Sequence, residues 1–198
     1  MAAGLDGIFD IPAGRIAAVV TSLDMQAPPV IPPDPVGDWS IRRVAQPDLD
    51  WYRDLYARVG REWLWSLRLR MSDAELAAVI RAAGVEIYTL AHDGGDEGLL
   101  ELDFRKTNEC ELALFGVTSK LIGTGAGRLL MNHALRRAWA QPLTRLWVHT
   151  CSFDHPRALT FYQRAGFRPY RRQIEIAPDP RLDGTLPREV AGHVPLLG

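Results

Sequence analysis

Cysteine is scarce in this sequence, with only Cys110 and Cys151 among 198 residues. One pair cannot form the disulfide framework that stabilises small secreted domains, so we expect reduced thiols and a cytoplasmic protein. An excess of charge of one sign is also lacking, because 23 basic and 24 acidic residues leave a net charge of −1. This balance favours neither a nucleic acid nor a membrane surface as a partner.

Long apolar runs, internal repeats and low-complexity blocks are absent as well. No stretch reaches the roughly 20 apolar residues that a membrane-spanning helix needs, and the N-terminal residues lack the pattern of a signal peptide. A hydrophobic content of 47% with 24% charged residues is typical of a soluble globular protein. The length suits one domain with a sizeable core.

Hydrophobic patterning divides the chain into three parts. Residues 1–37 hold a strand at 16–23 and a connector rich in proline, which must be extended because five prolines exclude a helix or a central strand. An isolated strand is unstable, so we expect it to dock on the edge of the main sheet, in its own chain or in a homodimer. Residues 38–178 form the main domain, and residues 179–198 form an irregular tail.

The order of expected elements in the main domain indicates a mixed α/β fold. The sheet should contain six or seven strands flanked by about four helices, with the N-terminal strand in addition. The expected strands are 39–44, 85–92, 98–105, 112–117, 146–151 and 170–176, and the expected helices are 48–60, 72–84, 126–140 and 156–166.

Three glycines at alternate positions stand between a strand and a helix. Gly123, Gly125 and Gly127 let the backbone approach a ligand closely, and the N-terminus of the following helix offers free N–H groups and partial positive charge. Together with Arg128 they predict a seat for a phosphate or pyrophosphate. An ordinary glycine-rich turn is the alternative.

Two common phosphate sites fit this turn poorly. A dinucleotide site needs an acidic residue at the end of the next strand, where residues 147–151 contain none. A Walker loop needs Lys and then Ser or Thr after the last glycine, where Arg128 and Leu129 stand.

Two motifs resemble those of the GNAT-type N-acetyltransferases. The segment IGTGAGRLL is similar to the CoA-binding motif R/Q-x-x-G-x-G/A, with Ile122 in the place of Arg or Gln. Residues 154–167, DHPRALTFYQRAGF, are similar to the second signature, N-x-x-A-x-x-F-Y-x-x-x-G-F, with His155 in the place of Asn. The resemblance spans residues 38–176 and implies a GNAT-like acyltransferase fold.

This resemblance implies transfer of an acetyl group from acetyl-CoA to a primary amine, by direct attack in a ternary complex and without a metal. Gly116 would permit close approach of the thioester to the backbone donors of residues 115–117, and Tyr162 would protonate the leaving thiolate. The CoA-binding residues implied are Phe115, Val117, Ile122, Gly123, Thr124, Gly125, Ala126, Gly127, Arg128, His155, Ala158, Phe161 and Tyr162.

The general base and the acceptor site are less defined by the motifs. Glu111, which opens the motif strand, stands where several family members carry a catalytic Glu, but other members use no side-chain base. Trp63 and Trp65 fall where the family lines its acceptor pocket, and Glu101 could face the same cleft as Glu111 if their strands pair. Packing in the core is the alternative for one tryptophan and for Tyr162.

Two further hypotheses concern a metal and a loss of catalysis. His149, Cys151 and His155 have a spacing that fits no common zinc site, so no metal is expected. Because Ile122 departs from the motif and the base is undefined, a CoA-binding sensor or partner-binding module on the same fold is the alternative to an active enzyme.

Overall fold

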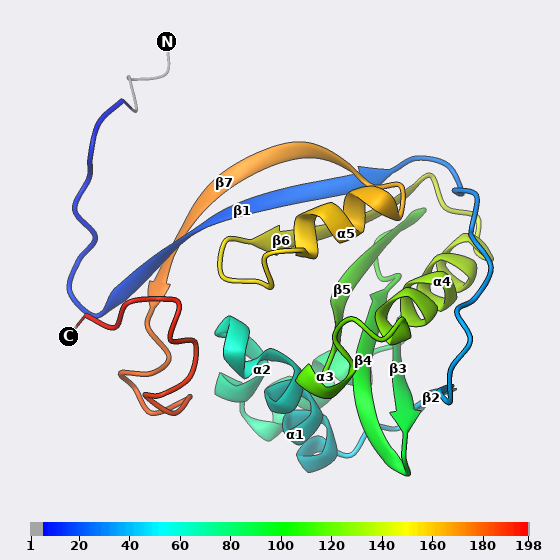
Figure 1. Cartoon of the computed structure of the whole chain (residues 1–198), viewed down its shortest axis with the longest axis horizontal. Coiled ribbons are helices and arrows are strands. Elements are labelled where there is room, and N and C mark those ends of the chain that lie inside the picture. Colours follow the sequence, from blue (N-terminus) through cyan, green and yellow to red (C-terminus); the bar gives the residue numbers. More distant parts are fainter. Residues whose placement is uncertain (1–5, 198) are drawn as a thin grey trace.

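A single seven-stranded mixed sheet organises the structure, a computed structural model that describes residues 6–197 (Figure 1). The strand order is β2-β3-β4-β5-β6-β1-β7, and all pairs are antiparallel except the parallel pair β5 and β6. The strands are β1 (Arg15–Met25), β2 (Ser40–Arg43), β3 (Val85–His92), β4 (Gly95–Asp103), β5 (Glu109–Val117), β6 (Arg145–Cys151) and β7 (Arg168–Pro178).

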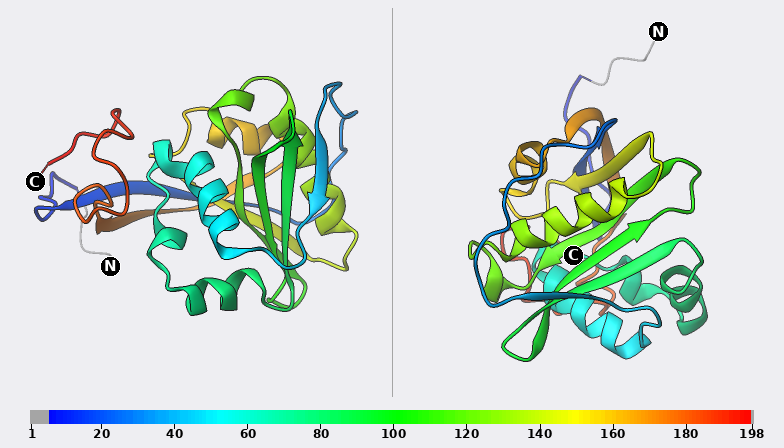
Figure 2. Two further views of the ribbon diagram at one scale, coloured as in Figure 1. Left: turned by 90° about the horizontal axis from the view of Figure 1, so that it is seen from below. Right: turned by 90° about the vertical axis from the view of Figure 1, so that its right-hand side faces the viewer.

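Helices cover both faces of this sheet, as Figures 1 and 2 show. On one face α4 and α5 bury a core with β1 and with β3 to β6, and on the other α1 and α3 bury a second core with β3 and β4. The helices are α1 (Leu49–Gly60), α2 (Leu67–Arg70), α3 (Asp73–Ile80), α4 (Ala126–Trp139) and α5 (Ala158–Arg164). The expected mixed α/β architecture is confirmed.

Helix boundaries follow local capping chemistry where the sequence carries it. The Asp48 side chain accepts from the first amides of α1, and Ser72 with Glu75 forms the capping box that opens α3. At the far end of α5, Gly166 takes the left-handed conformation, with a φ of 107°. Three details differ from expectation: α3 ends at Ile80, α5 begins at Ala158, and the short helix α2 was not predicted.

The position expected for the N-terminal strand is wrong. β1 does not dock at the sheet edge but lies between β6 and β7, so that β7 is the edge strand. Its last part, Val20–Met25, pairs with β6, while Arg15–Asp24 pairs with β7. Because β1 has a partner on each side, the main sheet includes it as an interior strand, and β7 is attached to the sheet through it.

The proline-rich connector between β1 and β2 is extended and runs along α4, as the path around the molecule in Figure 2 shows. Asn132 donates to the Pro32 carbonyl and to Asp34, and Arg136 donates to the same Asp34 carboxylate. These bonds hold the pKa of Asp34 below its ordinary value of 3.8, mainly through Arg136. The connector is therefore attached to the helix that follows the glycine turn.

The C-terminal tail contains no helix or strand after residue 178, within the part of the chain that the structure describes. It nevertheless packs around a buried ion pair, in which Arg181 donates to Asp179 and to carbonyls of Val190, Ala191 and Val194. The side chains of Leu186 and Ala191 are buried and pack against Leu64, which follows the end of α1. The tail thus closes one side of the molecule near Trp63, whose ring lies 5.8 Å from that of His193.

No helix between residues 6 and 197 is long and apolar enough to cross a membrane.

Candidate active site

The central cleft arises where two parallel strands separate. β5 and β6 pair only through Glu109–Glu111 and Arg145–Trp147, and β5 then continues to Val117 with β4 alone as a partner. Ala113 has no partner in β4, and such a bulge bends its strand. The backbone N–H groups of β5 beyond Glu111 that do not point to β4 therefore face the gap, which opens into a cavity of about 860 Å³.

The glycine turn forms one end of this cavity. The amides of Ile122, Thr124, Ala126 and Arg128 are all hydrogen-bonded within the turn and the first helical turn. Within residues 6–197, the alternate amides of Gly123, Gly125 and Gly127 have no partner. Three free donors at the N-terminus of a 14-residue helix fit a pyrophosphate.

The three glycines differ in what a side chain would meet. A Cβ on Gly125 would lie 3.3 Å from Pro35 of the connector and 3.4 Å from Trp39, and its φ is 109°. A Cβ on Gly127 would meet nothing within 4 Å, although Gly127 lines the cavity and has helical dihedrals. Gly125 is therefore needed for the connector and the turn, whereas Gly127 leaves space open on the ligand side.

Two residues expected at the CoA site point elsewhere. The Thr124 hydroxyl donates to the Leu121 carbonyl and accepts from the Ala126 amide, so it organises the turn. The side chain of Ala126 is fully buried in the core beneath α4. Val117, Ile122 and Arg128 do line the cavity, as do the three glycines.

Three of the arginines that line the cavity have no carboxylate partner. Arg128, Arg157 and Arg164 line the cavity, and none forms an ion pair within the described part of the chain. Arg157 and Arg164 lie seven residues apart, which puts them on one face of the segment that contains α5. Their charge fits the phosphates of a nucleotide cofactor. The sequence analysis had named only Arg128.

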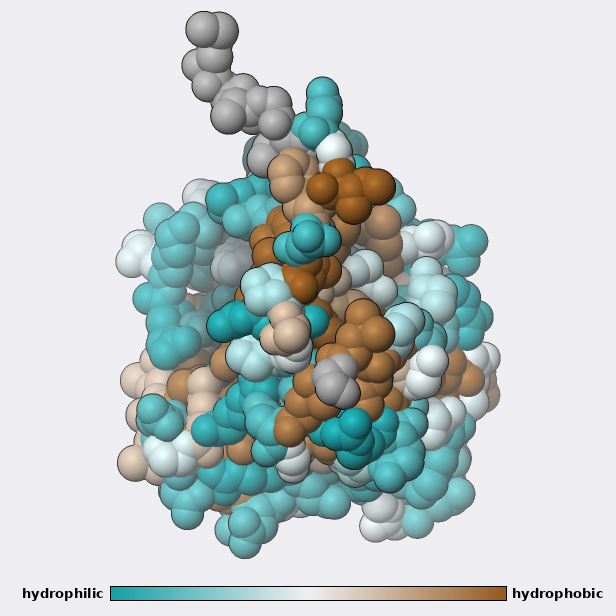
Figure 3. All heavy atoms as spheres, turned by 90° about the vertical axis from the view of Figure 1, so that its left-hand side faces the viewer, coloured by the Kyte–Doolittle hydropathy of each residue, from teal (hydrophilic) through white to brown (hydrophobic). Residues whose placement is uncertain are grey.

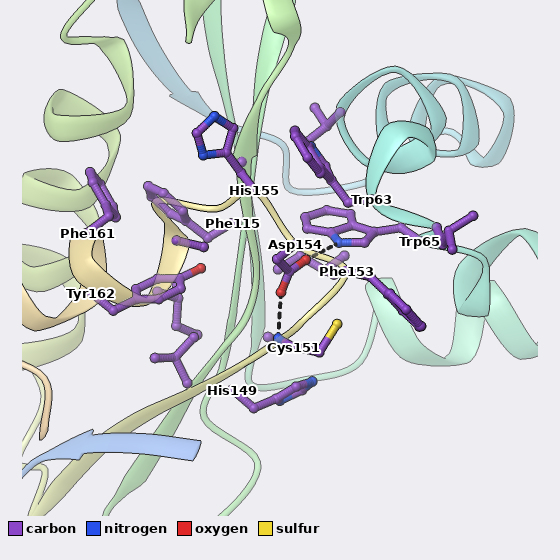
Figure 4. Close-up of a pocket in the computed structure, with 18 of the residues that line it drawn as sticks. Trp63, Trp65, Phe115, His149, Cys151, Phe153, Asp154, His155, Phe161 and Tyr162 are labelled. Carbon is purple, nitrogen blue, oxygen red and sulfur yellow. Dashed lines mark hydrogen bonds between the residues drawn. The ribbon is translucent and has the colours of Figure 1, made fainter. Parts of the chain in front are cut away.

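Aromatic side chains from α5 and β5 meet in the middle of the cleft (Figure 4). The rings of Phe115 and Phe161 stack at 5.5 Å, and Tyr162 lies edge-on to Phe115 at 6.1 Å. The phenol of Tyr162 is directed into the cavity, and burial raises its pKa above the ordinary value of 10.0. Tyr162 is therefore a protonated donor at neutral pH. Ala158 also lines this part.

Trp63 and Trp65 line the opposite end of the cavity. Trp65 packs on Tyr56 in the second core, and its Nε1 donates to Asp154 at 3.0 Å. Trp63 instead lies between two imidazoles, with His155 at 5.2 Å and His193 of the tail at 5.8 Å. Trp65 thus has the structural role that was expected for one of the pair, and Trp63 forms part of the exposed wall.

Glu111 lies beside His149, a contact that was not expected from the sequence. Its Oε1 lies 3.5 Å from Nδ1 of His149 on β6, and both side chains line the cavity. The hydrogen bond to Glu111 raises the pKa of His149 above its ordinary value of 6.5. The parallel pairing of β5 with β6 brings the two side chains to one face of the sheet, where they can exchange a proton with an acceptor.

Glu101 does not reach the cavity. Its side chain is 1% exposed, accepts from the Tyr52 hydroxyl at 2.6 Å, and forms an ion pair with Arg68 at 2.6 Å. Glu101 and Leu114 pair across β4 and β5, so Glu101 lies behind the lining residue Arg68. The expectation that Glu101 and Glu111 share one cleft is therefore wrong.

Asp154 is a further residue that sequence reasoning did not assign. One carboxylate oxygen accepts from Trp65, and the other accepts from the Thr150 hydroxyl and the Cys151 amide. It ties the end of β6 to the tryptophan segment across the cleft, as Figure 4 shows. The only signal in the sequence was its place as the first residue of the segment that resembles the second motif.

The glycine at position 116 is required for the packing of α1 on β5, in addition to the expected close approach of the thioester. A Cβ there would lie 2.5 Å from Val59 of α1, so only glycine lets this helix approach β5.

Among residues 6–197, no group of three or more His, Cys, Asp or Glu side chains is placed to hold a metal. Cys110 and Cys151 are both free thiols.

Free amides on a glycine turn, unpaired arginines and a buried phenol beside the separating strands would fit a nucleotide cofactor on this α/β fold. The family model for the acetyltransferase (GNAT) family matches residues 45–167. The chain belongs to this family.

Solved structures confirm the fold. A GCN5-related N-acetyltransferase from Kribbella flavida is 18% identical with a TM-score of 0.56, over 86% of this chain. A GNAT acetyltransferase from Elizabethkingia anophelis with acetyl-CoA bound is 18% identical with a TM-score of 0.52, over 68% of this chain and 78% of its own. The IAA acetyltransferase from Bacillus cereus is 21% identical with a TM-score of 0.53, over 68% and 79%.

The chain spans less than two thirds of the length of several matching structures, for example 63% of the Kribbella protein. No curated protein sequence matches the chain.

Proposed function

We propose that this protein is an acetyl-CoA-dependent N-acetyltransferase acting on a primary amine. The observation that carries the proposal is the set of free amides at Gly123, Gly125 and Gly127, beside unpaired arginines and continuous with the splay of β5 from β6. This arrangement offers a diphosphate site and a thioester site in one cavity of about 860 Å³.

Acetyl-CoA would bind with its diphosphate on the glycine amides and its pantetheine arm between β5 and α5. Ile122 has no charged side chain to contribute, but the backbone donors and Arg128 remain. The thioester oxygen would accept from a backbone donor of residues 115–117 that points away from β4, which would stabilise the oxyanion in the tetrahedral intermediate.

The acceptor would enter from the end lined by Trp63. The Glu111–His149 pair removes a proton from the ammonium group, directly or through water, because only the neutral amine attacks. The nitrogen then adds to the acetyl carbon to give the tetrahedral intermediate, and the bond from carbon to sulfur breaks as this intermediate collapses. Tyr162 donates its proton to the departing thiolate, and the nitrogen releases its second proton, which restores the Tyr162 hydroxyl directly or through water. A ternary complex of enzyme, acetyl-CoA and amine suits this site, because one continuous cavity extends from the glycine turn to Trp63.

Two measurements on the full chain test this proposal. Calorimetry with CoA should give saturable binding, and release of free thiol from acetyl-CoA should depend on an added amine, with an acetylated product of the expected mass. Binding of CoA without turnover on any amine would instead favour a CoA sensor, and absence of CoA binding would exclude both functions.

A further inference from the structure

The acceptor end of the cavity contains carboxylates that pair with no lysine or arginine in the described part of the chain. Glu175 on β7 lines it and has no ion-pair partner in the described part of the chain. Asp154 accepts only from neutral donors, namely an indole, a hydroxyl and an amide. Glu111 has only the His149 contact at 3.5 Å.

Two arginines at this end, Arg68 and Arg105, are already paired. Arg68 binds Glu101 at 2.6 Å, and the guanidinium of Arg105 binds both oxygens of Asp103. They therefore offer little free positive charge to a ligand. The local potential is negative, and the charges of Glu111, Asp154 and Glu175 all contribute to raising the pKa of His149.

The remaining wall is aromatic and aliphatic. Trp63, Trp65, Phe153 and Leu64 line one side, and Ala18 of β1 lines the other. Further apolar lining comes from the start of β1 and the end of β7, with Ile16, Ala177, Pro178 and Pro180. These surfaces suit a ring or a similarly bulky apolar group, because its transfer from water to such a wall is favourable.

Building on the proposed acetyltransferase activity, we propose that the acceptor is a cationic primary amine that carries an aromatic or similarly bulky apolar group and no carboxylate near the nitrogen. The ammonium group is attracted by Glu111, Asp154 and Glu175, and the apolar group lies against Trp63 and Phe153. An α-carboxylate would face the same acidic groups, while Arg68 and Arg105 are already held by Glu101 and Asp103.

A matched panel of amines tests this class. Thiol release is measured with phenethylamine, with phenylalanine, which adds only a carboxylate, and with spermidine, which is cationic but has no apolar group. We expect kcat/KM for phenethylamine to exceed that for phenylalanine by at least ~10-fold, since like charges in one site cost several kcal/mol. It should also exceed that for spermidine.

The charge effect is then tested in the protein. Glu175→Gln should raise the KM for phenethylamine ~3-fold or more with little change in kcat, and the difference should shrink at high salt because screening weakens an exposed charge. Glu189→Gln removes the same charge from an exposed tail position outside the cavity and should leave KM unchanged.

The outcomes separate this inference from the proposed function. Preference for phenylalanine or spermidine, or an unchanged KM in Glu175→Gln, would overturn the substrate class while leaving the acetyltransferase activity intact. Turnover of no amine at all, with CoA still binding, would contradict the proposed function and with it the substrate class.

Discussion

At the scale of single residues, Tyr162 is the group placed to assist thiolate departure. Tyr162→Phe retains the ring that packs on Phe115 and Phe167 and removes only the hydroxyl. We expect turnover to fall ~100-fold or more, the usual effect of a positioned acid, with a nearly constant KM for acetyl-CoA. Near-full turnover, measured where chemistry limits the rate, would show that solvent or backbone donors stabilise the thiolate.

Gly127 gives a sharper test of the phosphate seat than Gly125 does. Gly127→Val places methyl groups in open space on the ligand side, at helical dihedrals that valine tolerates, so the fold should be unaffected. We expect CoA affinity to weaken ~10-fold or more in calorimetry, since the backbone can no longer approach the diphosphate.

Gly192→Val is the control for that substitution, because a Cβ on Gly192 also meets nothing within 4 Å and the residue lies in the tail. It should bind CoA like the unmodified protein. Equal affinities of the two variants would contradict the assignment of the glycine turn.

Glu111 and His149 link activity to pH. Because Glu111 raises the pKa of His149 in the folded protein, the interaction stabilises the fold below the unfolded pKa of histidine and is lost as the pH rises through the folded value. Glu111→Gln should lower the pKa of His149, which an NMR titration of its imidazole measures. If the pair acts as the base, kcat/KM should fall and its low-pH limb should move to lower pH. An unchanged limb would exclude His149 from the base.

At the scale of elements, β1 carries more of the stability than a peripheral strand would. Leu23 is fully buried in the first core, whereas Val19 in the same strand is 44% exposed. Leu23→Ala should reduce the free energy of unfolding by about 2–5 kcal/mol, and Val19→Ala by less than about 1 kcal/mol, in urea denaturation. Similar losses for both variants would contradict an interior position of β1.

At the scale of the whole molecule, two exposed apolar features predict a homodimer. The segment before β1 extends away from the body (Figure 1) and exposes Ile8 and Phe9, and one face of the β1–β7 ribbon exposes Val19, Ile174 and Ile176. Figure 3 shows apolar residues gathered along the middle of the side from which the N-terminal segment extends. Ile8 and Ile174 are 101% and 73% exposed, so neither is covered within the chain. A second copy whose N-terminal segment packs on this face would bury both features.

Sedimentation of the full chain should show a dimer that dissociates in the double variant Phe9→Ser, Ile174→Ser. Val36→Ser removes an equally exposed valine from the connector and should sediment as the unmodified protein does. A monomer at all concentrations would refute the predicted assembly.

Local signals in the sequence were sufficient for the helices and turns of the site. Asp48, the Ser72–Glu75 capping box, the glycines before α4 and Gly166 after α5 each act through neighbours within four residues. The two motifs therefore indicated the family and the fold before any contact was known. The same reasoning located Tyr162 and the free glycine amides.

Only the tertiary structure decided which distant residues meet. β1 and β7 lie at opposite ends of the chain, and nothing in an alternating strand pattern specifies its neighbours, so its interior position could not be predicted. The same holds for Glu111 with His149, and for Trp65 with Asp154, which are far apart in sequence. The burial of Glu101 could not be predicted either. Its partner Arg68 belongs to the four-residue helix α2, which is too short to give a periodic pattern in the sequence.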